Sequence, residues 1–274
     1  MNWKITPKIL IVSILHVSDN KAMPIKDMIA IGKLFGFTGN VIRVTTARLV
    51  RDGRLENDER GLYRIKDMDT PISRFVNAWK QGEARVKEWD GAWICCLAPN
   101  GTAGRRKKNA KALELPGFRE GLPGLWVRPA NLTMDLTSLK KLLVHQGMDP
   151  AGELFVGRDF SEKTAVQWQK ILWPVEELVR DMEQALERIE KSKARIQGLP
   201  PESALMETYL VGTETVHMLV KDPLLPEEIM PPVHRMKLAG AMLEYNKIGK
   251  DVWEREAFGL RFSQSPSHME LEGV

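Results

Sequence analysis

Residues 38–65 read TGNVIRVTTARLVRDGRLENDERGLYRI, and this stretch predicts a helix that is followed by a tight hairpin. Thr38 is a good N-cap because its hydroxyl can accept a hydrogen bond from a first-turn amide. Gly53 supplies the left-handed residue that commonly ends a helix. The Asn, Asp and Gly residues within 57–61 indicate a turn, and the alternation over 62–65 is typical of a half-buried strand. This order is expected for the second half of a winged helix-turn-helix domain.

The predicted helix has two chemically different faces. At roughly 100° per residue, one face holds residues expected to point inward: Ile42, Thr45, Thr46 and Leu49. The opposite face is polar and small, and we expect it to contact DNA bases through Asn40, Arg43, Ala47 and Arg51. Arginine can chelate guanine, asparagine can read adenine, and small residues allow close approach to the groove.

Further arginines surround this face. We expect Arg48, Arg54, Arg60 and Arg64 to contact phosphates or to support the fold. Taken alone, the helix is more typical of a solvated surface, and a domain of this kind can also serve protein contacts without DNA. The basic residue at the hairpin tip, Arg60, favours DNA as the partner.

Two more helices are predicted before this stretch. Thr6 and Pro7 form a helix start, with proline at the first helical position, and Pro24 begins a second helix that runs to about Phe35. Three helices and a hairpin define a winged helix-turn-helix domain over residues 1–68.

Charge is distributed unevenly along the 274 residues. Residues 1–66 carry 12 Lys and Arg against 6 Asp and Glu, a net +6, whereas residues 151–274 carry 15 against 21, a net −6. The positive half therefore contains the predicted DNA-reading helix, which agrees with a polyanionic partner.

Several classes are not expected. No apolar run approaches the roughly 20 residues of a membrane span, and no signal peptide is evident. Cys95 and Cys96 are adjacent within an apolar run, which favours a buried strand in a reducing, cytoplasmic compartment over a disulfide or metal site.

The middle of the chain predicts a second domain. Residues 69–90 are expected to form a linker helix, and residues 91–160 alternate strands and helices in the order β-α-β-β-α-β. This order is typical of a small ferredoxin-like domain. Such a domain could act as a metal-dependent nuclease, so this alternative stays open. However, its first strand ends Leu97-Ala-Pro-Asn100 without a carboxylate, and no histidines have metal-ligand spacing. We therefore expect no enzyme, metal or cofactor.

The remaining sequence is predominantly helical. We predict an all-α domain over 161–262 and a disordered tail over 263–274. The segment 222–232 is rich in proline but too apolar for a solvated linker. The fold class is thus α+β, with a winged helix-turn-helix, a ferredoxin-like domain and a helical domain.

Three separated segments give the chain a family resemblance. The first runs from Ile42-Arg43 to Leu55, with the hairpin strand 61–65. The second comprises 89–93, Gly117-Phe118 and Pro123–Pro129. The third is VHMLVKDPLLPEEIMP, residues 216–231. In this order over some 250 residues they resemble the PaaX-like transcriptional regulators, the repressor family of phenylacetic acid degradation.

The resemblance implies a homodimer that binds a palindromic double-stranded DNA operator and represses a catabolic operon. It also implies release by a small-molecule effector, an aromatic acid or an acyl- or aryl-coenzyme A thioester. Two positions depart from the family pattern: Pro232-Val233-His234 follows the Leu-Pro turn where tryptophan is usual, and Trp173-Pro174 replaces a Trp-Asp pair. Both departures concern the effector more than DNA binding.

The expected effector site lies where the middle and helical domains meet. Aromatic rings could stack a ligand there and cations could pair with it, so the candidates are Trp126, Arg128, Trp173 and His217. The basic cluster beginning Arg105-Arg106 could hold an anionic effector at a helix start or touch DNA phosphates. A core role for the tryptophans is the favoured alternative, and the basic cluster is equally typical of a solvated helix face.

Overall fold

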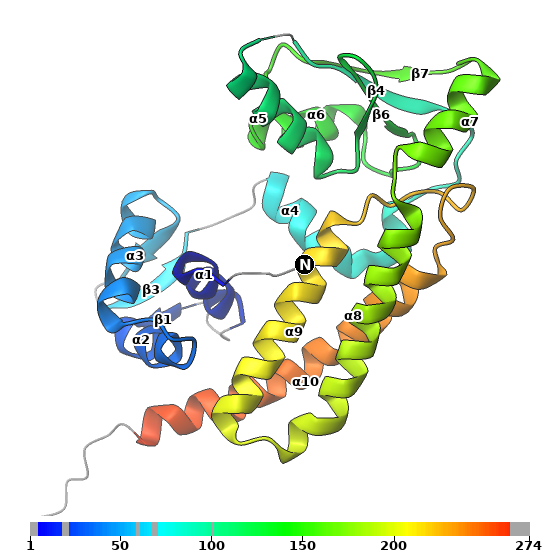
Figure 1. Ribbon diagram of the computed structural model, residues 1–274. Coiled ribbons are helices and arrows are strands. Elements are labelled where there is room, and N and C mark those ends of the chain that lie inside the picture. The colour runs from blue at the N-terminus through cyan, green and yellow to red at the C-terminus, as the bar shows by residue number, and fades with distance from the viewer. Residues whose placement is uncertain (1–4, 18–21, 59–60, 67–70, 100, 264–274) are drawn as a thin grey trace, which may run out of the picture. The chain divides into compact units, whose positions relative to one another are not determined.

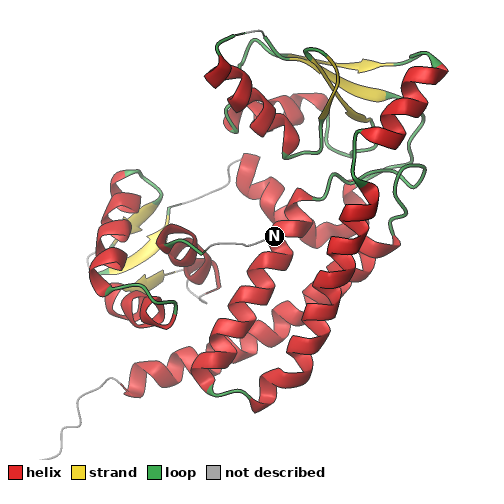
Figure 2. Ribbon diagram, in the orientation of Figure 1, coloured by secondary structure: helices red, strands yellow, loops and turns green. Residues whose placement is uncertain are grey.

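The protein is a mixed α+β chain, 61% helical, with two small antiparallel sheets (Figures 1 and 2). The computed structural model describes residues 5–17, 22–58, 61–66, 71–99 and 101–263. The chain forms two compact units that are discontinuous in sequence. Unit 1 comprises 1–68, 192–212 and 245–274, and unit 2 comprises 69–191 and 213–244. The C-terminal helices therefore contribute residues to both units.

Unit 1 begins with three short helices and a three-stranded sheet. The helices are α1 (Pro7–Val17), α2 (Ile25–Leu34) and α3 (Gly39–Arg51), and the strands are β1 (Ala22–Pro24), β2 (Leu55–Asn57) and β3 (Leu62–Ile65). The sheet order is β1-β3-β2, and both pairings are antiparallel. The sequence predicted the β2–β3 hairpin but missed β1, since three residues ending in proline carry no strand pattern.

Apolar residues of all three helices form the core of this part. Leu10, Ile11, Met28, Ile42 and Leu49 are each at most 2% exposed. Helices α2 and α3 approach closely at Gly32, where an added Cβ would lie 2.6 Å from Ile42 Cγ1. A larger residue at this position would push α3 away from α2.

The rest of unit 1 consists of the ends of longer helices. Phe35, just after α2, makes an edge-on ring contact with Tyr209 at a centroid distance of 4.9 Å. Ser192 and Tyr245 share a buried hydroxyl–hydroxyl hydrogen bond of 2.6 Å. These contacts join residues 192–212 and 245–263 to the N-terminal helices within one compact unit.

Unit 2 contains a four-stranded antiparallel sheet. Its strands are β4 (Trp93–Leu97), β5 (Arg119–Leu122), β6 (Leu125–Pro129) and β7 (Glu153–Gly157), in the order β5-β6-β4-β7. Helix α5 (Ala103–Glu114) connects β4 to β5, and α6 (Leu136–His145) connects β6 to β7. The chain order is therefore the β-α-β-β-α-β expected from the sequence.

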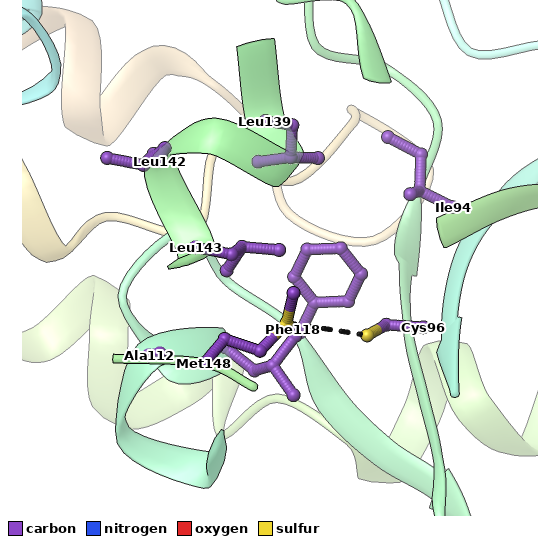
Figure 3. Close-up of a cluster of buried hydrophobic side chains, with 9 residues drawn as sticks. Ile94, Cys96, Ala112, Phe118, Leu139, Leu142, Leu143 and Met148 are labelled. Atoms are coloured by element: carbon purple, nitrogen blue, oxygen red, sulfur yellow. Dashed lines mark hydrogen bonds between the residues drawn. The ribbon is translucent and has the colours of Figure 1, made fainter. Parts of the chain in front are cut away.

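Helices α5 and α6 cover one face of this sheet. Figure 3 shows the buried cluster between them, in which Phe118 lies among leucines of α6 and beside Met148, Ala112 and Cys96. Cys96 Sγ lies 3.8 Å from Met148 Sδ. Burial raises the pKa of Cys96 to about 12, although the charge of Lys140 opposes this shift, and a thiol with so high a pKa is unreactive.

Tryptophans cover the opposite face. The ring of Trp93 stacks on Trp173 at 6.2 Å and meets Trp168 and Trp89 edge-on at 5.2 and 5.4 Å. Successive strand residues point to opposite faces, so Trp93 and Cys95 belong to this side, while Ile94 and Cys96 belong to the α5–α6 side.

The predicted linker helix is shorter than expected. Helix α4 spans Pro71–Asn77 and passes into a 3-10 helix, η1 (Ala78–Arg85), after which Val86 bridges to Leu132. The non-helical backbone of Gly82 (φ 54°) interrupts this segment.

The last part of the chain is helical, as predicted. It comprises α7 (Glu162–Ile171), α8 (Val175–Arg195), η2 (Ile196–Gly198), α9 (Pro201–Lys221) and α10 (Val233–Ser263). Within unit 2, α8 pairs with α9 through Arg188–Glu214 and with α10 through His234–Glu183, both at 3.3 Å. None of the described helices combines the length and the apolar character that crossing a bilayer requires. The predicted tail beyond Ser263 lies outside the described residues.

Candidate nucleic-acid interface

Helix α3 begins and ends where its sequence predicts. Thr38 Oγ1 accepts a hydrogen bond of 3.3 Å from Val41 N. At the other end, Gly53 has φ 68°, its N–H donates to Val50 O, and Arg54 N–H donates to Leu49 O. This pair of bonds around a left-handed glycine is the Schellman motif, and it stops the helix directly before the hairpin.

The two faces of α3 are separated as predicted. Ile42, Thr46 and Leu49 are buried, and the Thr46 hydroxyl is satisfied by donating to Ile42 O at 2.9 Å. The outward side, which we call the recognition face, consists of exposed residues: Asn40, Val41, Arg43, Val44, Ala47, Arg48 and Arg51. The fold thus presents this face to solvent and uses the other for the core.

Apolar side chains are part of the recognition face. Val44 is 61% exposed and Val41 is 39% exposed. Val41 was not among the predicted base contacts, and its position one turn before Thr45, which was expected to point inward, gave no signal for its exposure. Exposed methyl groups between arginines suit contact with a thymine methyl group in a major groove.

The arginines of this region differ in how they are engaged. Among the described residues, Arg43, Arg48 and Arg54 are exposed and have no ion-pair partner. Arg51 is 76% exposed at its side chain and lies 3.9 Å from Asp52, which is a loose surface pair. These four guanidinium groups are therefore available to an external anion.

Arg64 is engaged within the hairpin. Its Nη2 lies 2.8 Å from Asp58 Oδ2, and its Nε lies 3.8 Å from Glu56 Oε1. Asp58 also accepts a 2.9 Å bond from Leu62 N–H, so this pair braces the turn between β2 and β3. Of the two predicted roles for Arg64, support of the fold agrees with this geometry. Arg60 lies outside the described residues.

The predicted effector residues do not form one site. Arg128 is 1% exposed, and its Nε and Nη2 donate to Pro129 O at 3.1 Å and to Asn131 Oδ1 at 3.1 Å. Its Nη1 donates to Pro116 O, and Nη2 also lies 3.3 Å from Pro223 O. All three nitrogens thus bind the chain itself, so this buried side chain gives no support to the expected contact with a thioester or a phosphate.

The two predicted tryptophans lie on opposite faces of the unit 2 sheet. Trp126 packs against the cluster under α5 and α6, whereas Trp173 stacks on Trp93 on the other face. Trp173 is 2% exposed, and its Nε1 donates to Gly117 O at 3.1 Å. The core role, which the sequence left as an alternative, is the one that Trp173 has.

The other predicted effector residues are more accessible. His217 is half-buried, and burial, followed by the charge of Lys221, lowers its pKa. Arg105 lies 3.5 Å from Asp149, and Arg106 Nη1 donates to Gly101 O at 2.7 Å. Both arginines therefore have partners at the start of α5.

A buried polar cluster in unit 2 was not predicted. Three consecutive carbonyls of the segment after α9 each accept a bond from a side chain. The donors to Pro223, Leu224 and Leu225 are Arg128 (3.3 Å), Asn131 (2.7 Å) and Arg235 (2.7 Å). Arg235 also holds Glu83 with two bonds of 2.8 and 2.9 Å.

Asp222 is the least satisfied member of this cluster. Its Oδ1 accepts from Leu224 N at 3.0 Å, while its buried Oδ2 has no hydrogen-bond partner among the described residues. Burial raises the pKa of Asp222, opposed by the charges of Arg235 and Arg85. Leu224 itself has φ 53°. The apolar Pro-Leu-Leu-Pro sequence was the available signal, since it predicted a buried segment but not its polar anchors.

One shallow depression lies on the outer side of α6. It is open to solvent and lined by Thr137, Lys140, Lys141, Val144 and His145. None of the predicted effector residues lines it. In the described residues, no group of three or more potential metal-ligating side chains lies together.

Comparisons with known proteins relate the chain to a solved fold. No protein-family model matches the sequence, and no curated protein matches it significantly. A solved structure, the uncharacterized protein Rv0674 from Mycobacterium tuberculosis, superimposes with a TM-score of 0.61 at 18% sequence identity. The match covers 94% of this chain and 100% of that chain. The chain therefore shares, along nearly its whole length, the fold of that mycobacterial protein.

Proposed function

We propose that this protein is a DNA-binding transcriptional regulator whose α3 enters the major groove. The observation that carries the proposal is the recognition face. It combines base-reading side chains at Asn40 and Arg43 with exposed cations at Arg48 and Arg54 that have no ion-pair partner among the described residues. Exposed guanidinium groups on one helix face are suited to contact phosphates and the edges of guanines.

The arrangement around α3 supports a winged helix-turn-helix assignment. Helix α2 packs on α3 through the contact of Gly32 and Ile42, and the β2–β3 hairpin follows α3 after a single turn. In winged helices the second helix of the pair reads the groove and the hairpin lies beside it. The strand order of the other sheet, β5-β6-β4-β7, supports the ferredoxin-like assignment for the middle region.

The family resemblance adds finer proposals. They are a homodimer on a palindromic operator, repression of a catabolic operon, and release by an aromatic acid or coenzyme A thioester. With Arg128 and Trp173 occupied by protein contacts, the effector proposal no longer includes these two side chains. Thermal-shift measurements with coenzyme A thioesters test it, because a ligand at a hundredfold its Kd should stabilise the protein by about 2.7 kcal/mol.

DNA binding is tested by fluorescence anisotropy with duplexes from upstream of the protein's own gene. We expect the logarithm of the affinity to fall linearly with the logarithm of salt concentration, with a slope of about −0.9 per phosphate contacted. Arg48→Ala should weaken binding to all sequences and flatten this slope by about one contact. Arg180→Ala is the matched control, since Arg180 is an exposed arginine on α8.

A flat salt response, or equal behaviour of the two variants, would contradict the proposal. The same mixtures, incubated with Mg²⁺ or Mn²⁺, separate regulation from the nuclease alternative. A regulator leaves the duplex intact, whereas metal-dependent cleavage would support the enzyme.

A further inference from the structure

The two edge strands of the unit 2 sheet differ in regularity and in residue type. Strand β5, at one edge, has a register irregularity between Glu120 and Leu122 and carries Arg119 and Glu120. Bulges and charges are the usual protection of an edge strand against pairing with another chain. The β5 edge is therefore protected.

Strand β7, at the other edge, has no register irregularity, and its one charged residue, Glu153, is the first of the strand. All five of its residues pair in unbroken register with β4, from Glu153↔Leu97 to Gly157↔Trp93. Its central residues are Leu154, Phe155 and Val156, and the last two are 39% and 47% exposed. In Figure 1 the strand runs along the outer edge of the sheet. A regular, apolar and exposed edge is a template for strand addition.

We propose that β7 pairs antiparallel with β7 of a second copy of this chain, about a two-fold axis at Phe155. A two-fold axis perpendicular to the sheet opposes each residue with a residue on the same face, so that Phe155 meets the partner's Phe155. Leu154 then meets the partner's Val156, and Glu153 meets the partner's Gly157. The three apolar residues thus become cross-strand neighbours, which stabilise antiparallel pairs.

Both ends of β7 carry a charge that already has a partner in its own chain. Glu153 begins the strand and lies 3.1 Å from Lys140, and Arg158 follows its last residue and pairs with Asp90; the side chains of Glu153 and Arg158 are 70% and 55% exposed. Antiparallel pairing keeps the two copies of each charge at opposite ends of the contact, whereas parallel pairing would place like charges side by side, which is destabilising. The charge pattern therefore favours the antiparallel orientation.

This pairing gives the proposed homodimer a contact surface, and it rests on the sheet edge alone, independent of DNA binding. Five paired residues bury less than the roughly 1,200 Å² of a stable interface. The dimer should therefore depend on protein concentration, and it should form without DNA. An isologous contact also closes at two copies and does not propagate.

Disulfide trapping tests the register directly, with DNA absent. Residues opposed across an antiparallel pair have Cα separations of roughly 4.5–5.5 Å, which a disulfide can span. Phe155→Cys would also lie opposite Cys95 of its own chain, so the test uses a Cys95→Ala background. Cys96 faces the other side of the sheet and is fully buried. The matched control is Leu122→Cys in the same background, because Leu122 is 49% exposed on the protected β5 edge.

After mild oxidation we expect at least about threefold more covalent dimer from Phe155→Cys than from Leu122→Cys, because only the former cysteines face each other.

In the wild-type chain, Val156→Lys should raise the dimer dissociation constant about tenfold or more, because like charges near the axis repel. Leu122→Lys should leave the dissociation constant unchanged. Analytical ultracentrifugation measures the dissociation constants of the wild-type chain and of the two lysine variants. A wild-type chain that stays monomeric at high concentration overturns the proposal. So does a dimer that is insensitive to Val156→Lys and gives no excess crosslink at residue 155. A failure of DNA binding would leave all of these results unchanged.

Discussion

Arginine serves opposite purposes in two regions of this molecule. On α3, Arg43 and Arg48 extend into solvent without an ion-pair partner among the described residues. In unit 2, Arg128 and Arg235 are 1% and 3% exposed. The guanidinium nitrogens of each donate hydrogen bonds to carbonyls and side chains of the same chain. A buried guanidinium must be fully bonded to offset its desolvation, whereas an exposed one keeps its donors for a partner.

This contrast bears on Arg128, which the sequence offered as an effector candidate. In the sequence it lies beside tryptophan and proline, as a ligand-binding arginine could. In the structure, burial lowers its pKa to about 9, which still leaves it protonated at neutral pH. Its role is to fasten the segment after α9 to the end of β6 through Pro223. The two regions differ in whether the guanidinium groups are free to bind a partner, and not in whether arginines are present.

The largest expected effect comes from removing the buried arginine. Arg128→Met should lower the free energy of unfolding by about 3–5 kcal/mol, because it leaves several buried acceptors without a donor. Arg128→Lys should rescue little, since one ammonium group cannot reproduce the planar fork. Urea unfolding measures both variants. A loss below about 1 kcal/mol, the value for an ordinary surface pair, would break the contrast.

Removing an exposed arginine should leave stability intact and reduce DNA affinity. We expect Arg43→Ala to weaken operator binding by about 1–3 kcal/mol and to relax preference at one base position. Its unfolding free energy should stay within about 0.5 kcal/mol of wild type. Competition binding against operators that vary at single positions measures the preference. Equal weakening on every sequence would make Arg43 a phosphate contact instead.

Asp222 sharpens the contrast through pH. Its pKa is raised in the folded state by burial, so its contribution to stability is present below the unfolded pKa of about 4 and is lost as pH rises through the folded value. Asp222→Asn does not titrate and keeps the acceptor for Leu224 N–H. The variant should therefore gain stability relative to wild type as pH increases from about 4.

Urea unfolding of both proteins across the acidic range measures this difference. If the relative stability of Asp222→Asn falls with rising pH, then the attraction of Arg235 and Arg85 outweighs burial. The Asp222 carboxylate would then be stabilised by ion pairing with these arginines more than it is destabilised by burial.

Arg64 lies between the two extremes, and we expect the smallest effect there. Its pair with Asp58 is partly exposed at 42% and 27%, so Arg64→Ala should cost at most about 1 kcal/mol of stability. The hairpin turn keeps its Asp58 bond to Leu62 N–H. A DNA-affinity loss as large as that of Arg43→Ala would show that Arg64 leaves Asp58 to contact the operator.

Local patterns were sufficient for most of the secondary structure. The cap at Thr38, the left-handed Gly53 and the helix Leu136–His145 all depend on interactions within a few residues, so the sequence contains the needed information. The helical periodicity of apolar and polar positions likewise predicted which side of α3 is buried. Strand β1 was missed because its partner β3 lies about 40 residues away and its own three residues carry no strand pattern.

Which residues come together across the chain could not be obtained this way. Arg128 and Pro223 are 95 positions apart, and their contact depends on how α9, β6 and η1 pack. Trp126 and Trp173 face opposite sides of a sheet whose strand order is not the chain order. Periodicity specifies which side of one element is buried, because that depends on its own side chains. Long-range packing specifies which donor meets which acceptor, and it therefore assigned Arg128 to the core while leaving Arg43 exposed on α3.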